Sequence, residues 1–276
     1  MSKRRIVKLP AFNGVNAGQR ATLTLPVGAR KYHSLIVQYK DGTANQATTE
    51  AALKTLRVLV NGKSQREILV SQLNAREAYL GRTFQAGTVL MPFSENTART
   101  WQGEELLGWG TFNVSTLTAE IDIDAAAVAP ALTAYAEIED STEPLGGIVK
   151  WRRNSFQTAG AGVLAIRDLP RDPREAYQRF HIFTASATEV QLKADSDVIV
   201  ETISRDLLAK HYSRRPQKTI MQAGVLTLDL VASTQVTDFL PMLRTDNRLV
   251  QDFPLEVTVS GASNFDIITE VFGPAL

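Results

Sequence analysis

Short segments in which apolar and polar residues alternate run through the whole chain. Alternation of period two places one set of side chains on each face of a strand. The dipeptides Asp41-Gly42 and Asn61-Gly62 are typical of hairpin turns, because both residue types tolerate positive φ. The pattern therefore predicts an all-β protein. The segments that we expect to form strands are 21–25, 35–39, 56–60, 111–117, 120–124, 225–231 and 255–259.

Helical periodicity is confined to two longer segments. Apolar residues recur at helical spacing over 64–82 and again over 203–212. Each segment follows a predicted strand and turn, at 57–63 and 190–197, so one helix is expected in the same place in each half of the chain. Shorter helical turns are predicted near 102–107 and 237–243.

The order of segments in the first half recurs in the second half. LTLPVG precedes Tyr32 and its strand, just as VLAIRDLP precedes Tyr177 and its strand. The tripeptide QAG at 85–87 recurs at 222–224, and an alternating strand closes each half. Two successive all-β units of this kind favour two tandem eight-stranded jelly rolls, each with a short helix. An immunoglobulin-type sandwich ranks second, because it needs only about 100 residues per unit and has no such helix.

A change in charge marks the expected boundary between the two units. Residues 117–149 contain seven acidic residues and no Lys or Arg, whereas basic residues dominate the segment after Lys150. The turn-rich sequence IEDSTEPLGG lies at 138–147. We therefore expect an N-terminal jelly roll over 1–143 and a C-terminal one over 144–276.

Composition excludes several classes of protein. The chain of 276 residues has a net charge of +1, so it lacks the strong positive field of a dedicated nucleic-acid binder. It contains no cysteine, which removes thiol nucleophiles, disulfides and Cys-ligated zinc. The N-terminus has no signal-peptide core, and the longest apolar stretch, 125–136, contains Pro130 and is too short to span a membrane. We expect no integral membrane protein and no specific binding of nucleic acid.

Four strings resemble a known family: NAGQRATLTLPVG at 16–28, DIDAAAVAPALTA at 122–134, WRRNSF at 151–156 and AIRDLP at 165–170. They are similar to the corticovirus-type double jelly-roll major capsid proteins of tailless icosahedral bacteriophages with an internal membrane. The resemblance covers essentially the whole chain. It implies a homotrimer whose six barrels form a pseudo-hexagonal tile of the shell. The implied partners are neighbouring capsomers, vertex or minor capsid proteins and internal lipid, and the implied location is the virion, after synthesis in the bacterial cytoplasm.

Three carboxylates on one predicted strand are the candidate metal ligands. Glu120, Asp122 and Asp124 alternate with apolar residues and therefore share one face of the strand. Oxygen ligands of this kind suit calcium, particularly at a subunit boundary. The alternatives are an ordinary solvated strand face, or ion pairs with Arg152 and Arg153 of a neighbouring unit or subunit.

Two further groups are candidates for assembly. Trp151, Arg152 and Arg153 begin the second unit and are candidate interface residues, although Trp151 would serve equally well to pack the linker onto its barrel. A basic arm is the candidate membrane-facing segment, since cations near anionic lipid each contribute about 1 kcal/mol. Its alternatives are a frayed terminus and a contact beneath the neighbouring tile. The arm consists of Lys3, Arg4, Arg5 and Lys8.

No set of residues indicates catalysis. His33, His181 and His211 are too scattered for a metal triad, and the nucleotide-binding and hydrolase motifs are incomplete or absent. We expect a structural protein with no catalytic residues and with no cofactor other than the candidate calcium. The competing hypothesis is a non-viral tandem jelly-roll carbohydrate-binding or surface-layer module, followed by a jelly-roll hydrolase with paired carboxylates.

Overall fold

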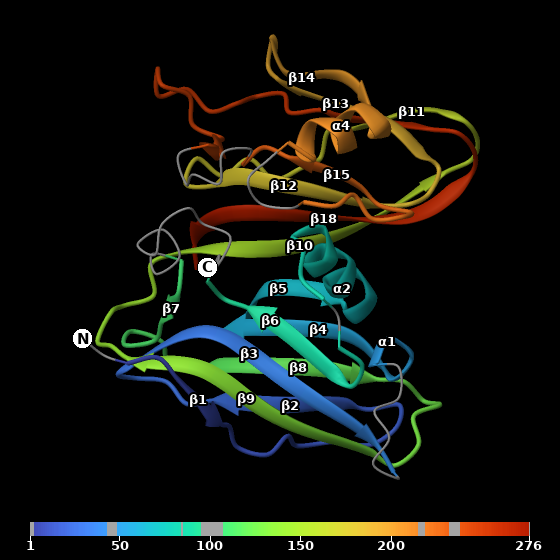
Figure 1. Cartoon of the computed structure of the whole chain (residues 1–276). Coiled ribbons are helices and arrows are strands. Elements are labelled where there is room, and N and C mark those ends of the chain that lie inside the picture. The colour runs from blue at the N-terminus through green and yellow to red at the C-terminus, as the bar shows by residue number, and fades with distance from the viewer. Residues whose placement is uncertain are drawn as a thin grey trace. The chain divides into compact units, whose positions relative to one another are not determined.

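The structure is a computed structural model that describes residues 3–42, 49–83, 85–94, 107–214, 219–231 and 238–275, except for the side chains of Thr49 and Glu50. This part of the chain forms two compact units (Figure 1). Unit 1 comprises Met1–Glu77, Thr83–Trp151 and Pro274–Leu276, and unit 2 comprises Ala78–Arg82 and Arg152–Gly273. A short segment from each half of the sequence therefore belongs to the opposite unit.

Unit 1 contains two antiparallel sheets. The first has the order β1 (Arg5–Lys8), β9 (Pro130–Asp140), β3 (Arg30–Asp41), β6 (Thr88–Pro92), with β7 (Trp109–Gly110) also paired to β3. The second has the order β5 (Lys63–Leu69), β4 (Leu53–Val60), β8 (Leu117–Ile123), β2 (Arg20–Leu25). Two helices accompany them, α1 (Thr49–Ala52) and α2 (Val70–Tyr79), of which α2 connects β5 to the loop before β6.

Unit 2 repeats this arrangement. Its first sheet has the order β10 (Gly147–Thr158), β18 (Ser263–Pro274), β12 (Ala176–Phe183), β15 (Leu226–Asp229), with β16 (Leu240–Pro241) also paired to β12. Its second sheet has the order β11 (Gly162–Ile166), β17 (Leu255–Val259), β13 (Ala187–Ala194), β14 (Asp197–Ser204). The helix α4 (Arg205–Tyr212) follows β14, as α2 follows β5.

Every strand of one unit thus has a counterpart in the other. The order β1-β9-β3-β6 corresponds to β10-β18-β12-β15, and β5-β4-β8-β2 corresponds to β14-β13-β17-β11. Two four-stranded sheets connected in this order make a jelly roll. The prediction of two tandem eight-stranded jelly rolls, each with a helix in the same place, is confirmed.

The repeat extends to individual hydrogen bonds. The hydroxyl of Tyr32 donates to the carbonyl of Pro26 at 2.6 Å, and that of Tyr177 donates to the carbonyl of Pro170 at 2.7 Å. Beside each tyrosine the strand carries an irregularity, between Tyr32 and Ser34 on β3 and between Tyr177 and Arg179 on β12. The repeated loops in front of Tyr32 and Tyr177 are therefore held in the same way in both units.

The QAG repeat has a backbone explanation. Gly87 and Gly224 have φ values of 75° and 73° and lie just before β6 and β15. Glycine adopts this left-handed conformation without the steric cost of a Cβ atom. The same turn therefore leads into the equivalent strand of each unit.

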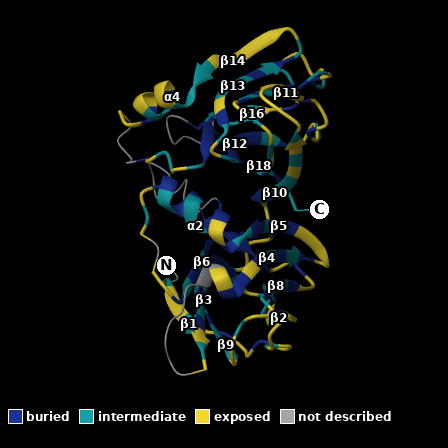
Figure 2. Cartoon of the chain, turned by 90° about the vertical axis from the view of Figure 1, so that its right-hand side faces the viewer, coloured by how far each residue is buried: buried dark blue, intermediate teal, exposed yellow. Residues whose placement is uncertain are grey.

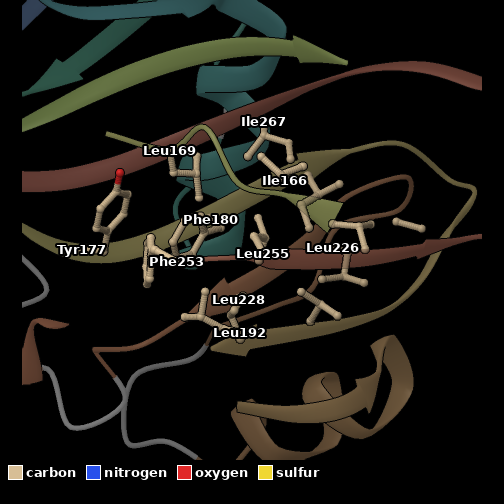
Figure 3. Close-up of a cluster of buried hydrophobic side chains, with 14 of the residues drawn as sticks. Ile166, Leu169, Tyr177, Phe180, Leu192, Leu226, Leu228, Phe253, Leu255 and Ile267 are labelled. Carbon is tan, nitrogen blue, oxygen red and sulfur yellow. The ribbon is translucent and has the colours of Figure 1, made fainter. Parts of the chain in front are cut away.

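Aromatic and branched side chains between its two sheets form the core of unit 2 (Figure 3). Tyr177 stacks on Phe180 with ring centroids 5.2 Å apart, and Phe253 packs against both rings. Leu192, Leu255 and their neighbours on β13 and β17 fill the remaining space. Burial of such side chains is the main stabilising term in a β-sandwich.

Three local predictions differ from the structure. The helix expected over 64–82 begins only at Val70, since 63–69 form strand β5. The strand expected over 111–117 is a loop up to Leu117, and the Ala-rich segment 130–140, for which no strand was expected, is β9. The helical turn expected near 102–107 lies outside the described residues except for Leu107, and the turn expected near 237–243 is wrong from Leu240 onward, where the chain forms strand β16.

Candidate assembly site

The Arg66 cluster is a buried arrangement of one guanidinium and several aromatic rings in unit 1. Arg66 on β5 lies 4.3 Å from the ring centroid of Trp151 and 5.0 Å from that of Trp109. Its Nε donates to the carbonyl of Val149 at 2.8 Å, and Arg76 on α2 covers the Trp151 ring at 4.5 Å. A buried charge is tolerated only when its donors are satisfied, and here backbone carbonyls and π faces satisfy them.

Trp151 is consequently a core residue of its own chain. It pairs with Arg66 across a parallel bridge between β10 and β5, and its side chain is 2% exposed. The ring therefore has no surface left for contact with another molecule. The Trp151 ring, which β10 carries, covers the buried guanidinium of Arg66.

The other two candidate interface residues lie in unit 2 and have partners there. Arg152 makes a two-pronged ion pair with the buried carboxylate of Glu175, at 2.6 and 2.8 Å. Arg153 binds Asp266 at 2.8 Å. Both arginine side chains keep about a quarter of their surface exposed, so some of each remains accessible.

The row of carboxylates on β8 is paired with cations of the neighbouring strands. Asp122 accepts hydrogen bonds from Arg20 on β2 and Arg57 on β4, both at 2.7 Å, and Glu120 lies 3.4 Å from Arg20. Burial alone would raise the pKa of Asp122, but these two hydrogen bonds outweigh it and hold that pKa below its usual value. Ile121 and Ile123 point into the core, as the alternation predicted.

Within this chain the three candidate calcium ligands have cationic partners, and calcium binding by them stays a prediction. Asp124 accepts the backbone N–H of Ala126 at 2.8 Å and pairs with Lys54 at 3.1 Å, and these two contacts lower its pKa. Among the described residues no group of three carboxylate or histidine side chains is arranged to hold a metal ion. The positive charge that calcium would supply comes from Arg20, Arg57 and Lys54 instead.

This pairing predicts indifference to calcium. We expect the melting temperature of the wild-type protein to be the same with EDTA as with millimolar calcium, because the carboxylates already have cationic partners. The Asp124→Ala variant should show the same indifference in differential scanning fluorimetry. A calcium-dependent rise in melting temperature that Asp124→Ala abolishes would show that the carboxylates do bind the ion.

The basic arm is a strand rather than a frayed terminus from Arg5 onward. Residues 5–8 form β1, which pairs with β9 from Tyr135 to Ile138. The guanidinium of Arg5 binds both carboxylate oxygens of Asp140, at 2.7 and 2.9 Å. Ile6 is 67% exposed although it lies in a strand.

Unit 2 contains a buried ionic network on β12, β15 and β18. Arg179 lies 3.2 Å from Asp229 and 3.0 Å from Glu270, and all three side chains are almost fully buried. His181 contacts Glu270 at 2.8 Å, and the hydroxyl of Tyr79 donates to Asp229 at 3.1 Å. Because one guanidinium is shared by two carboxylates, each member depends on the others for its compensation.

His33 in unit 1 is buried without comparable compensation. Burial lowers the pKa of His33 from 6.5 to about 4, and the positive charges of Arg4 and Lys31 lower it further in the same direction. Its Nε2 lies 3.7 Å from Glu139, too far for a strong hydrogen bond. The imidazole is therefore neutral at pH 7.

The pH dependence of stability follows from this shift. Between pH 6.5 and about 4 the unfolded chain binds a proton at His33 that the folded chain does not, so the free energy of unfolding decreases as the pH falls. The expected loss attributable to His33 is up to about 3 kcal/mol. Urea unfolding of wild type and His33→Asn at pH 7 and pH 4.5 measures it. The free energy of unfolding should fall less between pH 7 and pH 4.5 in the variant than in wild type. An equal fall in both proteins would show that His33 is not the cause.

Unit 2 has an open side at the edge strand β14. Val198 and Ile199 on β14 are 44% and 38% exposed, and Leu207 on α4 is also exposed (Figure 2). Beside them lies a cavity of about 410 Å³ lined mainly by apolar side chains. An exposed strand edge with apolar side chains is unusual in a soluble monomer and is typical of a surface that pairs with another chain.

The described residues contain no helix that is long and apolar enough to cross a membrane. Of the three tryptophans, Trp109 and Trp151 are buried and Trp101 lies outside the described residues. The histidines His33 and His181 are buried in different units, in the surroundings given above. The sequence did not predict the Arg66 cluster, the ionic network or the open side, since each depends on which strands become neighbours.

Comparison with known proteins assigns the family. The chain matches the viral coat protein P2 N-terminal domain over residues 6–139 and the viral coat protein P2 C-terminal domain over residues 148–275. It is similar to the major capsid protein P2 of Pseudoalteromonas phage PM2, with 27% identity over 282 residues, covering 98% of this chain and 97% of that protein.

Solved structures show the same fold. The crystal structure of the major capsid protein P2 from bacteriophage PM2 has a TM-score of 0.86 at 20% identity, over 99% of this chain and 98% of that one. A chain from the atomic structure of Sulfolobus turreted icosahedral virus has a TM-score of 0.70 at 9% identity, over 99% of this chain and 91% of that one. The duplicated barrel and the two consecutive domain matches lead to one conclusion: the chain belongs to the P2 viral coat protein family, the corticovirus-type double jelly-roll coat proteins.

Proposed function

We propose that this protein is the major capsid protein of an icosahedral, membrane-containing bacteriophage and that it builds the shell from pseudo-hexagonal trimers. The observation that supports this most directly is the duplication of one jelly roll within the chain. Three copies of a chain with two similar barrels present six similar barrels around one axis, which suits hexagonal tiling. Neighbouring tiles and vertex or minor capsid proteins are its partners in the shell.

Mass in solution tests the trimer. Size-exclusion chromatography with light scattering should give three times the chain mass of 30.3 kDa, and negative-stain electron microscopy should show six-sided particles. A protein that stays monomeric at all concentrations and shows no such particles would overturn the proposal.

The rival carbohydrate-binding module has little to support it in the described residues. A sugar-binding platform needs several exposed aromatic rings side by side, but both described tryptophans are buried, and Phe112 is the one phenylalanine among the exposed large hydrophobic residues of the described part of the chain. Glycan-array binding by a monomer would favour the rival.

Three finer assignments accompany the proposal. Arg152 and Arg153 contribute their exposed surface to a subunit interface. The domain boundary lies between residues 143 and 144, in the connection between β9 and β10. The basic residues Lys3, Arg4, Arg5 and Lys8 face the inside of the shell, toward lipid or the neighbouring tile. Deletion of residues 1–4 should weaken binding to anionic vesicles if lipid is the partner, and unchanged binding would favour the tile.

A further inference from the structure

The cavity of unit 2 corresponds, residue by residue, to the Arg66 cluster of unit 1. In unit 1, strand β5 begins at Lys63, and Arg66 lies three residues further on, opposite Val58 of β4. In unit 2, strand β14 begins at Asp197, and Val200 lies three residues further on, opposite Leu192 of β13. Val200 therefore occupies in unit 2 the place that Arg66 occupies in unit 1. Val200 lines the cavity.

Two further registers give the same correspondence. Leu35 pairs with Met91 on β6, and its counterpart Phe180 pairs with Leu228 on β15. Tyr32 pairs with Trp109 on β7, and its counterpart Tyr177 pairs with Leu240 on β16. Both Leu228 and Leu240 line the cavity. Leucines thus stand where unit 1 has a methionine and a tryptophan.

The two sites differ in what closes them. In unit 1, Trp151 of β10 pairs with Arg66 in parallel register and fills the cluster. In unit 2 the described residues provide no strand beside β14 other than β13, and the cavity stays open. The strand that closes the cluster, β10, is the counterpart of β1 in the repeated topology.

The strand β1 has the properties that the cavity requires. Within the described residues it pairs only with β9, so its other edge is available, and Ile6 is 67% exposed. The two edges also carry opposite charges, since Lys8 on β1 is basic and Glu201 on β14 is acidic, whereas Arg5 and Asp197 are already paired with Asp140 and Arg244 in their own chain. Opposite charges on two strand edges favour their pairing and set its register.

We propose that β1 of one copy docks in parallel along β14 of a second copy and places Ile6 in the cavity of unit 2. This inference rests on the proposed trimer and names the contact that joins its subunits. Each subunit contributes β14 to one neighbour and β1 to the other, so three such contacts close a ring. Ile6 of one chain would thus cover the cavity of another chain, as Trp151 covers the Arg66 cluster within its own chain.

Cross-linking between two single-cysteine chains tests the contact, because the natural chain contains no cysteine. Ile6→Cys and Ile199→Cys chains carrying different tags are co-expressed, and the purified trimer is treated with a short bis-maleimide. We expect a covalent pair that carries both tags. The control replaces Ile199→Cys with Val163→Cys, which is 64% exposed on β11, at the opposite edge of the same sheet. It should give at most a tenth of the cross-linked product.

A charge placed at Ile6 provides the second test. Ile6→Asp should raise the dissociation constant of the trimer by about 10-fold or more, since each subunit interface loses an apolar contact and gains a buried charge. The far-UV circular dichroism spectrum should not change, because the side chain is exposed within its own chain.

The outcomes separate this inference from the proposed function. A wild-type trimer that gives no specific cross-link, or that Ile6→Asp leaves intact, overturns the β1–β14 contact and leaves the capsid function standing. A wild-type protein that remains monomeric overturns both.

Discussion

Replacing Trp151 with alanine is expected to lower the free energy of unfolding by about 3–5 kcal/mol. The side chain is 2% exposed and lies between the guanidinium groups of Arg66 and Arg76. Its removal leaves a large cavity and takes away the ring that compensates the buried charge of Arg66. Urea denaturation followed by circular dichroism measures the change.

The Trp151→Phe variant is the matched control. It keeps an aromatic face for both guanidinium groups and loses only part of the volume, so its cost should be clearly smaller than that of Trp151→Ala. A loss below about 1 kcal/mol for Trp151→Ala would contradict this prediction, because it would show that the cluster collapses around the missing ring.

Replacing Arg179 with methionine should have a comparably large effect, about 3–5 kcal/mol. The substitution leaves Asp229 and Glu270 buried without their shared guanidinium. Asp229 would keep the hydrogen bond from Tyr79, and Glu270 would keep its contact with His181, but both would lose the guanidinium, which is costly in the interior unless they take up protons. Urea titrations of wild type and variant at pH 7 measure the difference in free energy of unfolding.

An exposed pair provides the control for this second substitution. Arg167 binds Asp252 at 2.8 and 2.9 Å with both side chains about half exposed, so Arg167→Met should cost less than about 1 kcal/mol. If Arg179→Met and Arg167→Met lower the free energy of unfolding equally, burial does not make the Arg179 network more stabilising than an exposed ion pair.

The sequence predicted those strands whose side chains alternate clearly. In β8 the buried positions are aliphatic and the outward positions polar, which is the pattern of a half-buried strand, and β4 follows it except at the buried Thr55 and the half-buried Leu59. Strand β5 was missed because two of its buried positions are Gln65 and Arg66, so its inward face does not look apolar. The strand β9 was missed because its inward side chains include Ala134 and Ala136, which contribute little to the hydrophobic pattern.

The candidate site was predictable only in part. Alternation placed Glu120 and Asp122 on one outward face, and the structure has them there. Their partners Arg20 and Arg57 could not be inferred, because the order β2-β8-β4 joins segments that are far apart in the sequence. For the same reason the sequence left Trp151 open between a subunit interface and packing of the linker onto its barrel, because the neighbour that decides its role is Arg66.

The exchange of short segments between the two halves has a consequence for protein synthesis. Tyr79, within the segment 78–82, reaches Asp229 in unit 2, and the last three residues of the chain belong to unit 1. The first barrel therefore cannot be completed on the ribosome before residues 274 and 275 have been made, and the second barrel needs residues 78–82 from the first half. A gene cut between codons 143 and 144 would yield two fragments that each lack a piece of their own fold, so the fragments should be recovered in soluble form only when they are produced together.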